Sequence, residues 1–414
     1  MIEIFPQSYN LFTCPQCKSD AVRQHKLIFQ GIHLLADLEC RNCGFEFYHD
    51  FPVGHGVTYP AVVDKKNLRV LSPKGMDWYT QPLINSLQQP SAQPVTVSKK
   101  INGEAADPKK AIFCNCLDAW YGHVLLKLMN VQFYHDRYPG YKIIVLLPAG
   151  FTWMVPDYVH EIWTADIKLR NTVHYFLQLE AFILQELKQY AAVYHSRGYS
   201  HPKLQEIRVQ DFFRVPAFHR ENFLKAPPQF LYVYREDRLW INPFLSRVFN
   251  FLNHRNIKFL NGFFYGLQAK RINRLAQKIK NRLPNSSFYV CGLGSRGKFL
   301  SDITDRRAAR LNEQLELDWC QLYAQSHVVI GIHGSNMLIP SALSAAWVEI
   351  LPDDRVGNIS QDLFCKHAFN EMVFFGRFAS PYDPVSRIAD MACGVIENYK
   401  SFSDHQVHNY DINK

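Results

Sequence analysis

The sequence predicts an α/β protein with two doubly wound parallel sheets and a small β module at its N-terminus. Three observations support this fold class. From Ala111 to Leu351, strand-like apolar runs alternate with helix-like amphipathic segments, a pattern typical of parallel sheets covered by helices on both faces. The length of 414 residues suits two large domains and a small extra piece. Before residue 44, two closely spaced pairs of cysteines flank a segment typical of a β-hairpin.

The composition indicates a well-folded chain that favours anionic ligands. Hydrophobic residues make up 47% and charged residues 20% of the sequence, so no long disordered stretch is expected. The formal net charge of +9 favours a nucleoside diphosphate, a nucleic acid or an acidic membrane surface as a partner. The densest basic sets, Lys278–Arg282 and Arg306–Arg310, are interpreted as solvated helix faces.

Neither an export signal nor a membrane span is expected. The start, Met1–Pro6, lacks the basic region of a signal peptide. The charge-free stretch Ile143–Pro156 in the middle of the chain contains two prolines and a glycine and is too short to cross a bilayer. The ten cysteines are then expected as reduced thiols. We predict a cytoplasmic protein without a transmembrane segment, compatible with peripheral contact at the inner face of a membrane.

Two Cys-x-x-Cys pairs predict a zinc ribbon over residues 1–55. The four residues are Cys14, Cys17, Cys40 and Cys43. Each pair places two thiolates on one side of a tight turn, and two pairs complete a tetrahedral site. Segments His25–Phe29 and His33–Leu38 predict a β-hairpin between the pairs, and Gly44 supplies a position suited to positive φ. Because a four-thiolate site has no open coordination position, the expected Zn²⁺ is structural.

Beyond the ribbon, the alternation of elements predicts two lobes. Residues 56–225 form the first lobe, with an irregular lead-in up to about Lys110. Its predicted elements are strands at Ala111–Cys116, Lys142–Leu147 and Arg208–Arg214 and helices at Tyr121–Tyr138 and Phe176–His195. Ala226–Pro228 marks the boundary, and residues 226–414 form the second lobe with a closing helix. Its predicted elements are strands at Phe230–Tyr234, Ile257–Leu260, Phe288–Cys291, His327–Ile330 and Trp347–Leu351, and helices at Leu267–Arg282, at Asp318–Ala324 and from Asn242 and Asn336 onward.

The most informative stretch is Val328–Met337, where an apolar strand runs into a Gly-x-His-Gly turn before a helix start. Backbone N–H groups at a helix start, together with the helix dipole, bind phosphate. Gly334 allows close approach of the backbone, and His333 offers a hydrogen bond to a phosphate oxygen. An ordinary structural histidine in a strand–turn–helix connection is the alternative interpretation.

Three motifs, this turn and two earlier segments of the chain, resemble motifs of family 61 glycosyltransferases. Gly331–Met337 followed by Trp347–Pro352 resembles the family's Gly-x-His-Gly turn and its strand ending in Glu-x-x-Pro. Tyr232–Arg238, with Asn242 after it, resembles the family's strand followed by Arg-x-x-Arg and Asn. Asn115–His123 resembles a first-lobe segment in which an aromatic-rich turn leads to a histidine at a helix start. The sequence departs from the family in Ser335-Asn336, which replace a small Ala-Gly pair, and in the zinc ribbon.

The resemblance implies a GT-B-like pair of doubly wound Rossmann-type lobes and an inverting sugar transfer without a catalytic metal. The implied enzyme moves a hexosyl or pentosyl group from a nucleotide-sugar donor to a glycan or other hydroxyl acceptor, as in surface polysaccharide synthesis. The implied donor-binding residues are Arg235, Arg238, Asn242, His333, Gly334, Ser335, Asn336 and Glu349. No convincing Asp-x-Asp metal motif accompanies them.

The chemistry of these residues fits such a reaction. A metal-free transferase neutralises the departing diphosphate with protein groups, and Arg235 and Arg238 offer planar forks for phosphate oxygens. Glu349 is expected to accept hydrogen bonds from the donor ribose or base. The acceptor hydroxyl needs a base, for which Asp118 and His123 are the candidates. Each of these residues also has an ordinary structural interpretation.

The competing interpretation is a nucleic-acid- or protein-binding module built around the zinc ribbon, without transferase activity. Nucleic-acid binding would require basic and aromatic residues near the cysteine pairs. Acidic and basic residues are nearly balanced over residues 1–50, so no nucleic-acid partner is expected. A different transferase that uses the same phosphate turn is a further alternative.

Overall fold

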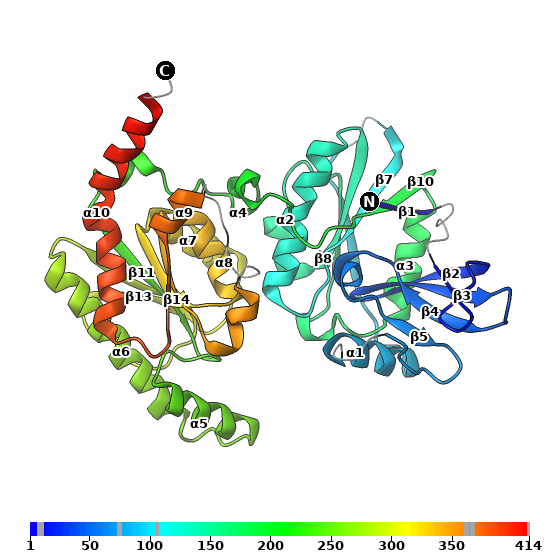
Figure 1. Cartoon of the computed structure of the whole chain (residues 1–414), viewed down its shortest axis with the longest axis horizontal. Helices are drawn as coiled ribbons and strands as arrows, with labels where there is room; N and C mark the ends of the chain where they lie inside the picture. Colours follow the sequence, from blue (N-terminus) through cyan, green and yellow to red (C-terminus); the bar gives the residue numbers. More distant parts are fainter. Residues whose placement is uncertain (6–11, 73–76, 104–106, 360–363, 365–368, 412–414) are drawn as a thin grey trace. The chain divides into compact units, whose positions relative to one another are not determined.

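The computed structural model describes residues 1–5, 12–72, 77–103, 107–359, 364 and 369–411. The chain divides into two compact units, Met1–Lys203 and Leu204–Lys414, and each contains a sheet with helices packed on it (Figure 1). This division precedes the boundary predicted at Ala226. Phe223 is buried in the core of the second unit, and Phe218 donates its backbone N–H to the carbonyl of Leu343 at 2.7 Å.

The main sheet of the first unit has six strands in the order β1-β10-β7-β8-β9-β6. The strands are β1 (Ile2–Phe5), β6 (Val97–Ile101), β7 (Asp107–Asn115), β8 (Tyr141–Pro148), β9 (Glu161–Ala165) and β10 (Ala192–His195). Strands β10, β7, β8 and β9 are parallel, and the edge strands β1 and β6 are antiparallel. The chain order reverses between β7 and β10, so their carboxyl ends form a topological switch point, the usual place of a ligand in such sheets.

Helix α2 (Tyr121–Arg137) connects β7 to β8 and packs on both strands. Most residues of α2 are buried, including apolar residues such as Leu125 and Leu128. The buried set also includes Lys127, a charged residue that needs a partner at such a position. The other helices of this unit are α1 (Asp77–Gln88) and α3 (Leu177–Leu187).

The cysteine module is a four-stranded antiparallel sheet in the order β2-β3-β4-β5. Its strands are β2 (Val22–Gln30), β3 (His33–Cys40), β4 (Glu46–Asp50) and β5 (Val62–Asp64). Leu38 and Phe47 of this sheet belong to the same buried cluster as Phe113 and Trp163 of the parallel sheet. The module therefore shares a hydrophobic core with the rest of the first unit.

The sheet of the second unit has six parallel strands in the order β13-β12-β11-β14-β15-β16. The strands are β11 (Gln229–Arg235), β12 (Ser287–Leu293), β13 (Ile303–Ala308), β14 (Val328–Ile332), β15 (Ala346–Ile350) and β16 (Gly376–Ala379). Counted along this unit, the order is 3-2-1-4-5-6, which is the strand order of the Rossmann fold. Its switch point lies between β11 and β14.

Helices cover both faces of this second sheet (Figure 1). The α-helices described in the second unit are α4 (Val209–Phe213), α5 (Pro243–His254), α6 (Asn261–Arg282), α7 (Glu313–Gln325), α8 (Leu338–Leu343), α9 (Phe369–Phe375) and α10 (Val385–Asp411). Helices α6 and α10 pack on each other, and α10 also packs on β14 and β15. Three short 3-10 turns matter below: η1 (Gly54–Val57), η6 (Ser335–Met337) and η7 (Asp353–Asn358).

The predicted fold class is confirmed, because the chain is α/β with two Rossmann-type sheets and a four-cysteine β module near its N-terminus. Two predicted strands are wrong. Residues 208–214 contain helix α4 and end in the left-handed conformation at Arg214 (φ 60°). Residues 257–260 form the connection between α5 and α6. Most of these residues are exposed, and among the described strands none pairs with them.

One predicted helix and the predicted lead-in also need correction. The helix expected over 176–195 ends at Leu187, because Ala192–His195 complete the parallel sheet as β10 beside β7. The lead-in up to Lys110 is not irregular, since it contains β5, α1, β6 and the first residues of β7. Residues 73–76 and 104–106 of this lead-in lie outside the described residues. Helix α1 has Pro82 inside it, which hides its helical pattern in the sequence.

Candidate functional site

At the switch point of the second sheet, two arginines meet the histidine–glycine turn. Arg235 is the last residue of β11, and His333 directly follows β14. Nη1 of Arg235 donates to Oδ1 of Asn336 at 2.6 Å, and Nη1 of Arg238 donates to the carbonyl of His333 at 3.2 Å. Because β11 and β14 are parallel neighbours, their carboxyl ends carry both segments to one edge. The structure thus brings together four of the predicted donor-binding residues.

Positive charge is crowded at this edge. Burial lowers the pKa of Arg238, and the neighbouring guanidinium groups of Arg235 and Arg355, the latter from η7, lower it further. Two exposed carboxylates partly balance these cations: Asp237 accepts from Nε of Arg235 at 2.7 Å, and Asp354 lies 3.9 Å from Arg238. An anion bound among the three guanidinium groups would relieve their mutual repulsion. The arrangement therefore suits a phosphate or diphosphate ligand.

Gly334 is required by this geometry. Its backbone has φ 147° and ψ 175°, a region that residues with a Cβ atom essentially do not adopt. A Cβ atom added there would lie 3.0 Å from Nη1 of Arg235 and 3.3 Å from Oδ1 of Asn336. The absent side chain leaves room for the contact between these two residues.

A buried carboxylate fixes the imidazole of His333. Glu349 lies on β15 opposite Gly331 of β14, and its Oε2 contacts Nδ1 of His333 in a short hydrogen bond. Both side chains are fully buried. Glu349 is therefore not an exposed carboxylate. Its hydrogen bond fixes the orientation of the His333 ring. Its role as an acceptor for the donor ribose or base remains a prediction.

Ser335 and Asn242 lie in local structures of their own. Ser335 begins η6, and only the six residues of α8 follow in place of the helix expected from Asn336. A helix this short contributes a weak dipole, so the charge at this edge comes mainly from arginine side chains. Asn242 is exposed and caps α5, its Oδ1 accepting the backbone N–H of Phe244 at 2.9 Å.

A neighbouring glycine loop was missed by the sequence analysis. Gly292–Gly297 has the spacing G-x-G-x-x-G and follows β12, a signal that could have found it. Here it leads to strand β13 and not to a helix, so it is not a dinucleotide-binding fingerprint. Oε1 of Glu236 accepts the backbone N–H groups of Ser295 and Arg296, each at 2.8 Å. These two backbone N–H groups are therefore already bound by a carboxylate of the protein.

In the first unit, Asp118 is the centre of a polar cluster at the switch point. It follows the end of β7 and is fully buried. Its Oδ1 accepts from Nδ1 of His123 at 3.0 Å and its Oδ2 accepts from Nε2 of His55 at 3.0 Å. Nζ of Lys127 forms an ion pair with the same Oδ2 at 2.8 Å. The structure thus joins the two predicted catalytic residues and adds His55 from η1 and Lys127 from α2, which the sequence analysis missed.

This environment keeps Asp118 charged and His55 neutral near neutral pH. Burial by itself raises the pKa of Asp118, but the charge of Lys127 and hydrogen bonds from His123 and His55 bring that pKa well below its usual value. Burial lowers the pKa of His55. The contact with Asp118 uses Nδ1 of His123 and leaves Nε2 as the other ring nitrogen. The His123 side chain is 23% exposed, compared with 9% for His55, so it is the more accessible histidine of the cluster.

A metal ion fits this cluster poorly. The ligand atoms of His55, Asp118 and His123 all lie within 4.8 Å of one another, which by itself would allow a cation. However, the ammonium group of Lys127 is 2.8 Å from Oδ2 of Asp118 and would repel that cation. The cluster suits proton transfer better than metal binding.

Aromatic side chains lie around His123. The ring of Trp120 lies 5.2 Å from that of His123, the ring of Trp78 lies 6.3 Å from that of Trp120, and the ring of Tyr199 lies 5.4 Å from that of His123. Trp78 and Trp120 are both exposed. They offer flat apolar surfaces with polar edges beside His123.

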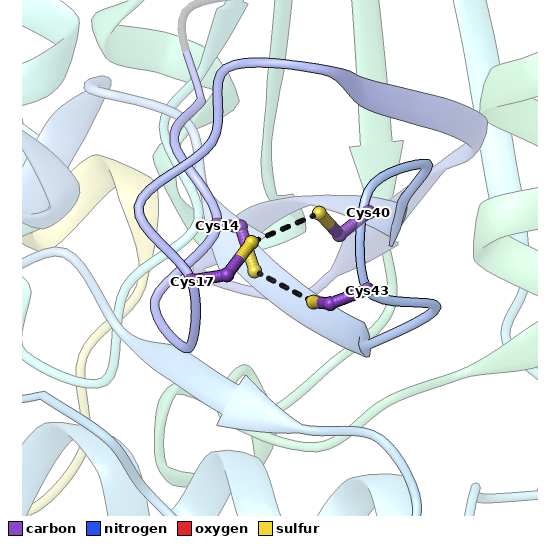
Figure 2. A group of neighbouring side chains, drawn as sticks. All are labelled: Cys14, Cys17, Cys40 and Cys43. Carbon is purple, nitrogen blue, oxygen red and sulfur yellow. Dashed lines mark hydrogen bonds between the residues drawn. The ribbon is translucent and has the colours of Figure 1, made fainter.

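The four cysteines have the geometry of a metal site (Figure 2). Sγ of Cys14 lies 3.7 Å from Sγ of Cys43, and Sγ of Cys17 lies 3.5 Å from Sγ of Cys40. A tetrahedron with Zn–S bonds of about 2.3 Å has sulfur atoms about 3.8 Å apart. The distances exclude disulfide bonds. The fit supports a tetrahedral metal held by four thiolates.

Two matching turns build this site. The N–H of Lys18 donates to the carbonyl of Cys14 at 3.0 Å, and the N–H of Gly44 donates to that of Cys40 at 2.8 Å. Lys18 and Gly44 have φ of 61° and 68°, so each residue after a cysteine pair adopts the left-handed conformation that was predicted for Gly44. Asn42 donates to Sγ of Cys17 at 3.6 Å and is the main cause that lowers the pKa of Cys17 to about 6.

Comparison with known proteins gives distant structural likenesses. No protein-family model matches the sequence, and no curated protein matches it. Among solved structures, E. coli ADP-heptose lps heptosyltransferase II is similar at 10% identity and a TM-score of 0.40, over 70% of this chain and 99% of that one. E. coli heptosyltransferase WaaC with ADP is similar at 11% identity and a TM-score of 0.39, with the same coverage. A trehalose-6-phosphate synthase is similar at 11% identity and a TM-score of 0.24, over 66% of this chain and 62% of that one. These TM-scores are too low to carry a conclusion about this chain.

Proposed function

We propose that the protein is an inverting, metal-independent glycosyltransferase of the family 61 type. It would move a sugar from a nucleotide-sugar donor to a hydroxyl of a glycan or similar acceptor in the cytoplasm, as in surface polysaccharide synthesis. One observation carries the proposal: Arg235 and Arg238 meet the turn around His333 at the switch point of a Rossmann-type sheet. Switch points are where such sheets bind nucleotides.

On the donor side, the two arginines would hold the diphosphate. As the bond between the anomeric carbon and the diphosphate oxygen breaks, negative charge grows on that oxygen. Fixed guanidinium groups stabilise this charge without reorganising, and their planar forks match phosphate oxygens. His333 would add a hydrogen bond, held in place by Glu349.

On the acceptor side, His123 would act as the general base. Its Nε2 would take the proton of the acceptor hydroxyl while the acceptor oxygen attacks the anomeric carbon from the face opposite the leaving diphosphate. Asp118 would stabilise the imidazolium that forms, because its carboxylate accepts Nδ1–H at 3.0 Å. The exposed rings of Trp78 and Trp120 would position the sugar ring of the acceptor.

We also propose that the four cysteines hold a structural Zn²⁺. Four thiolates are the usual ligands of structural zinc, and the sulfur distances fit its tetrahedron. Because the cysteine module shares the core of the first unit, the metal would stabilise that unit as a whole and take no part in the transfer.

Calorimetric titration with UDP-, GDP-, CMP-, dTDP- and ADP-sugars tests the proposal. We expect one nucleotide class to bind, and we expect Arg238→Ala to weaken that binding at least tenfold because it removes a charge-assisted phosphate contact. Arg387→Ala is a matched control, since it removes an exposed arginine of the same unit. The proposal fails if no nucleotide binds, or if both variants bind as the wild type does.

A further inference from the structure

Helices α5 and α6 and the connection between them carry exposed apolar side chains, here named the α5–α6 patch. Its residues are Phe244, Phe251, Phe259, Leu260 and Phe263. The four phenylalanines are 69%, 57%, 83% and 60% exposed, in that order. Figure 1 shows α5 at the end of the second unit, beyond the helices that cover its sheet.

The exposed rings are not needed to hold the two helices together. The buried contact between the helices is made by other side chains, with the rings of Phe249 and Phe264 5.4 Å apart. Asn242 caps α5 and Pro243 starts it, so this helix forms without help from the exposed face. A preformed surface of this kind exposes apolar area that a soluble protein normally buries, which marks an interaction site.

The charge of the chain segment that contains the patch has one sign. No Asp or Glu occurs between Asp237 and Asp302, whereas this interval contains twelve Lys or Arg residues. Since the whole chain carries a formal charge of +9, the rest of the chain is net negative. The exposed basic residues within the patch region are Arg247, His254, Arg255 and Lys258. The guanidinium of Arg255 lies 5.0 Å from the ring centre of Phe251, so basic and aromatic groups are interleaved.

An anionic lipid surface matches both features. Phenylalanine side chains enter the boundary between headgroups and acyl chains, and basic residues interact with acidic headgroups. Phe244 and Phe251 are seven residues apart on α5 and share one face, with Arg247 between them. A nucleic-acid duplex would use the basic residues for phosphate contacts but gives no reason for four exposed phenylalanines on adjacent elements. Among the described residues no helix is apolar and long enough to span a bilayer, so the contact would be with the membrane surface.

We propose that the α5–α6 patch docks on the surface of an anionic phospholipid bilayer. The phenylalanine rings insert to the level of the headgroup boundary, and Arg247, Arg255 and Lys258 lie among the acidic headgroups. This docking is independent of the proposed sugar transfer, because it depends on the outer face of α5 and α6 and not on the residues at the sheet edge.

Vesicle co-sedimentation of the full chain tests this proposal. We expect binding to phosphatidylcholine vesicles that contain about one-third phosphatidylglycerol, little binding to pure phosphatidylcholine, and a loss of binding at high salt. The double variant Phe259→Ser/Phe263→Ser should bind at least tenfold more weakly. The double variant Arg255→Gln/Lys258→Gln should bind roughly thirtyfold more weakly, or about fivefold for each cation removed.

Ile101→Ser is the matched control, because it removes an equally exposed apolar side chain from the first unit. All variants change exposed residues, and unchanged thermal unfolding confirms that they fold. Retained transferase or nucleotide-binding activity with lost vesicle binding separates this proposal from the proposed function. Equal binding of the Phe259→Ser/Phe263→Ser variant and the wild type overturns it, as does the absence of vesicle binding together with salt-sensitive binding of duplex DNA.

Discussion

Replacing Asp118 by Asn probes the buried cluster of the first unit directly. The carboxylate oxygens accept from His123 and His55 and form an ion pair with Lys127, whereas an asparagine has one oxygen and one N–H₂ donor. Whichever way the amide turns, its N–H₂ group meets at least one donor, and the buried ammonium of Lys127 loses its counter-charge. Breaking a buried ion pair by removing one partner costs about 3–5 kcal/mol. For a unit of this size, each kcal/mol lowers the melting temperature by about 2–4 °C, so we expect a fall of roughly 6–20 °C in the unfolding of the first unit.

The pH dependence gives this prediction its sharpest form. The pKa of Asp118 is held well below its usual value in the folded protein, so its stabilising contribution is complete above the unfolded-state pKa of about 4. That contribution is lost as the pH falls through the lower folded-state pKa. Because Asn does not titrate, the difference in stability between wild type and Asp118→Asn should be full at pH 7 and shrink below about pH 4.

Thermal and guanidinium unfolding of both proteins across this pH range measure the difference. Lys127→Met in the Asp118→Asn background should recover part of the loss, since it removes the uncompensated charge. The reasoning is refuted if Asp118→Asn unfolds within about 1 °C of the wild type at pH 7, or if the difference stays constant into acid.

Three further predictions address the other sites. His123→Ala should lower the transfer rate about 10²–10⁴-fold, the usual contribution of a general base, and leave the nucleotide-sugar dissociation constant unchanged; near-normal turnover would remove the base assignment. Gly334→Ala should cost about 1–3 kcal/mol of stability through backbone strain and weaken nucleotide binding by displacing Arg235, and unchanged calorimetric affinity would contradict this. Cys17→Ser should reduce the metal content measured by mass spectrometry from about one Zn²⁺ per chain and lower the melting temperature of the first unit, whereas a metal-free wild type with the same melting temperature would exclude a metal site.

Local motifs made part of the candidate site predictable. Arg235 ends one apolar strand and His333 directly follows another, and parallel strands bring their carboxyl ends to one edge. The cysteine turns were predictable for the same reason, because the spacing of each pair fixes its geometry within four residues. What the sequence did not indicate is that Glu349 is directed at His333, since that contact depends on the register between β14 and β15.

Residues joined by long-range contacts were missed. His55 comes from a 3-10 turn 63 positions before Asp118, and no periodic pattern connects the two. Lys127 had a detectable signal, because it follows His123 by one helical turn on α2. Strand β13 was missed because its residues are mostly polar and exposed at the sheet edge, where burial does not impose an apolar pattern.

Two histidine–carboxylate pairs of similar geometry differ in the chemistry that they suit. In both units a fully buried carboxylate fixes Nδ1 of a histidine near a switch point, Asp118 with His123 and Glu349 with His333. His333 is itself fully buried beside arginines, so it cannot reach a hydroxyl in solution but can shape an anion site. His123 is 23% exposed next to aromatic rings, so its Nε2 can accept a proton from a bound acceptor. Exposure, more than pairing, is therefore the reason why the proposed function gives the role of base to His123 and a hydrogen bond in the anion site to His333.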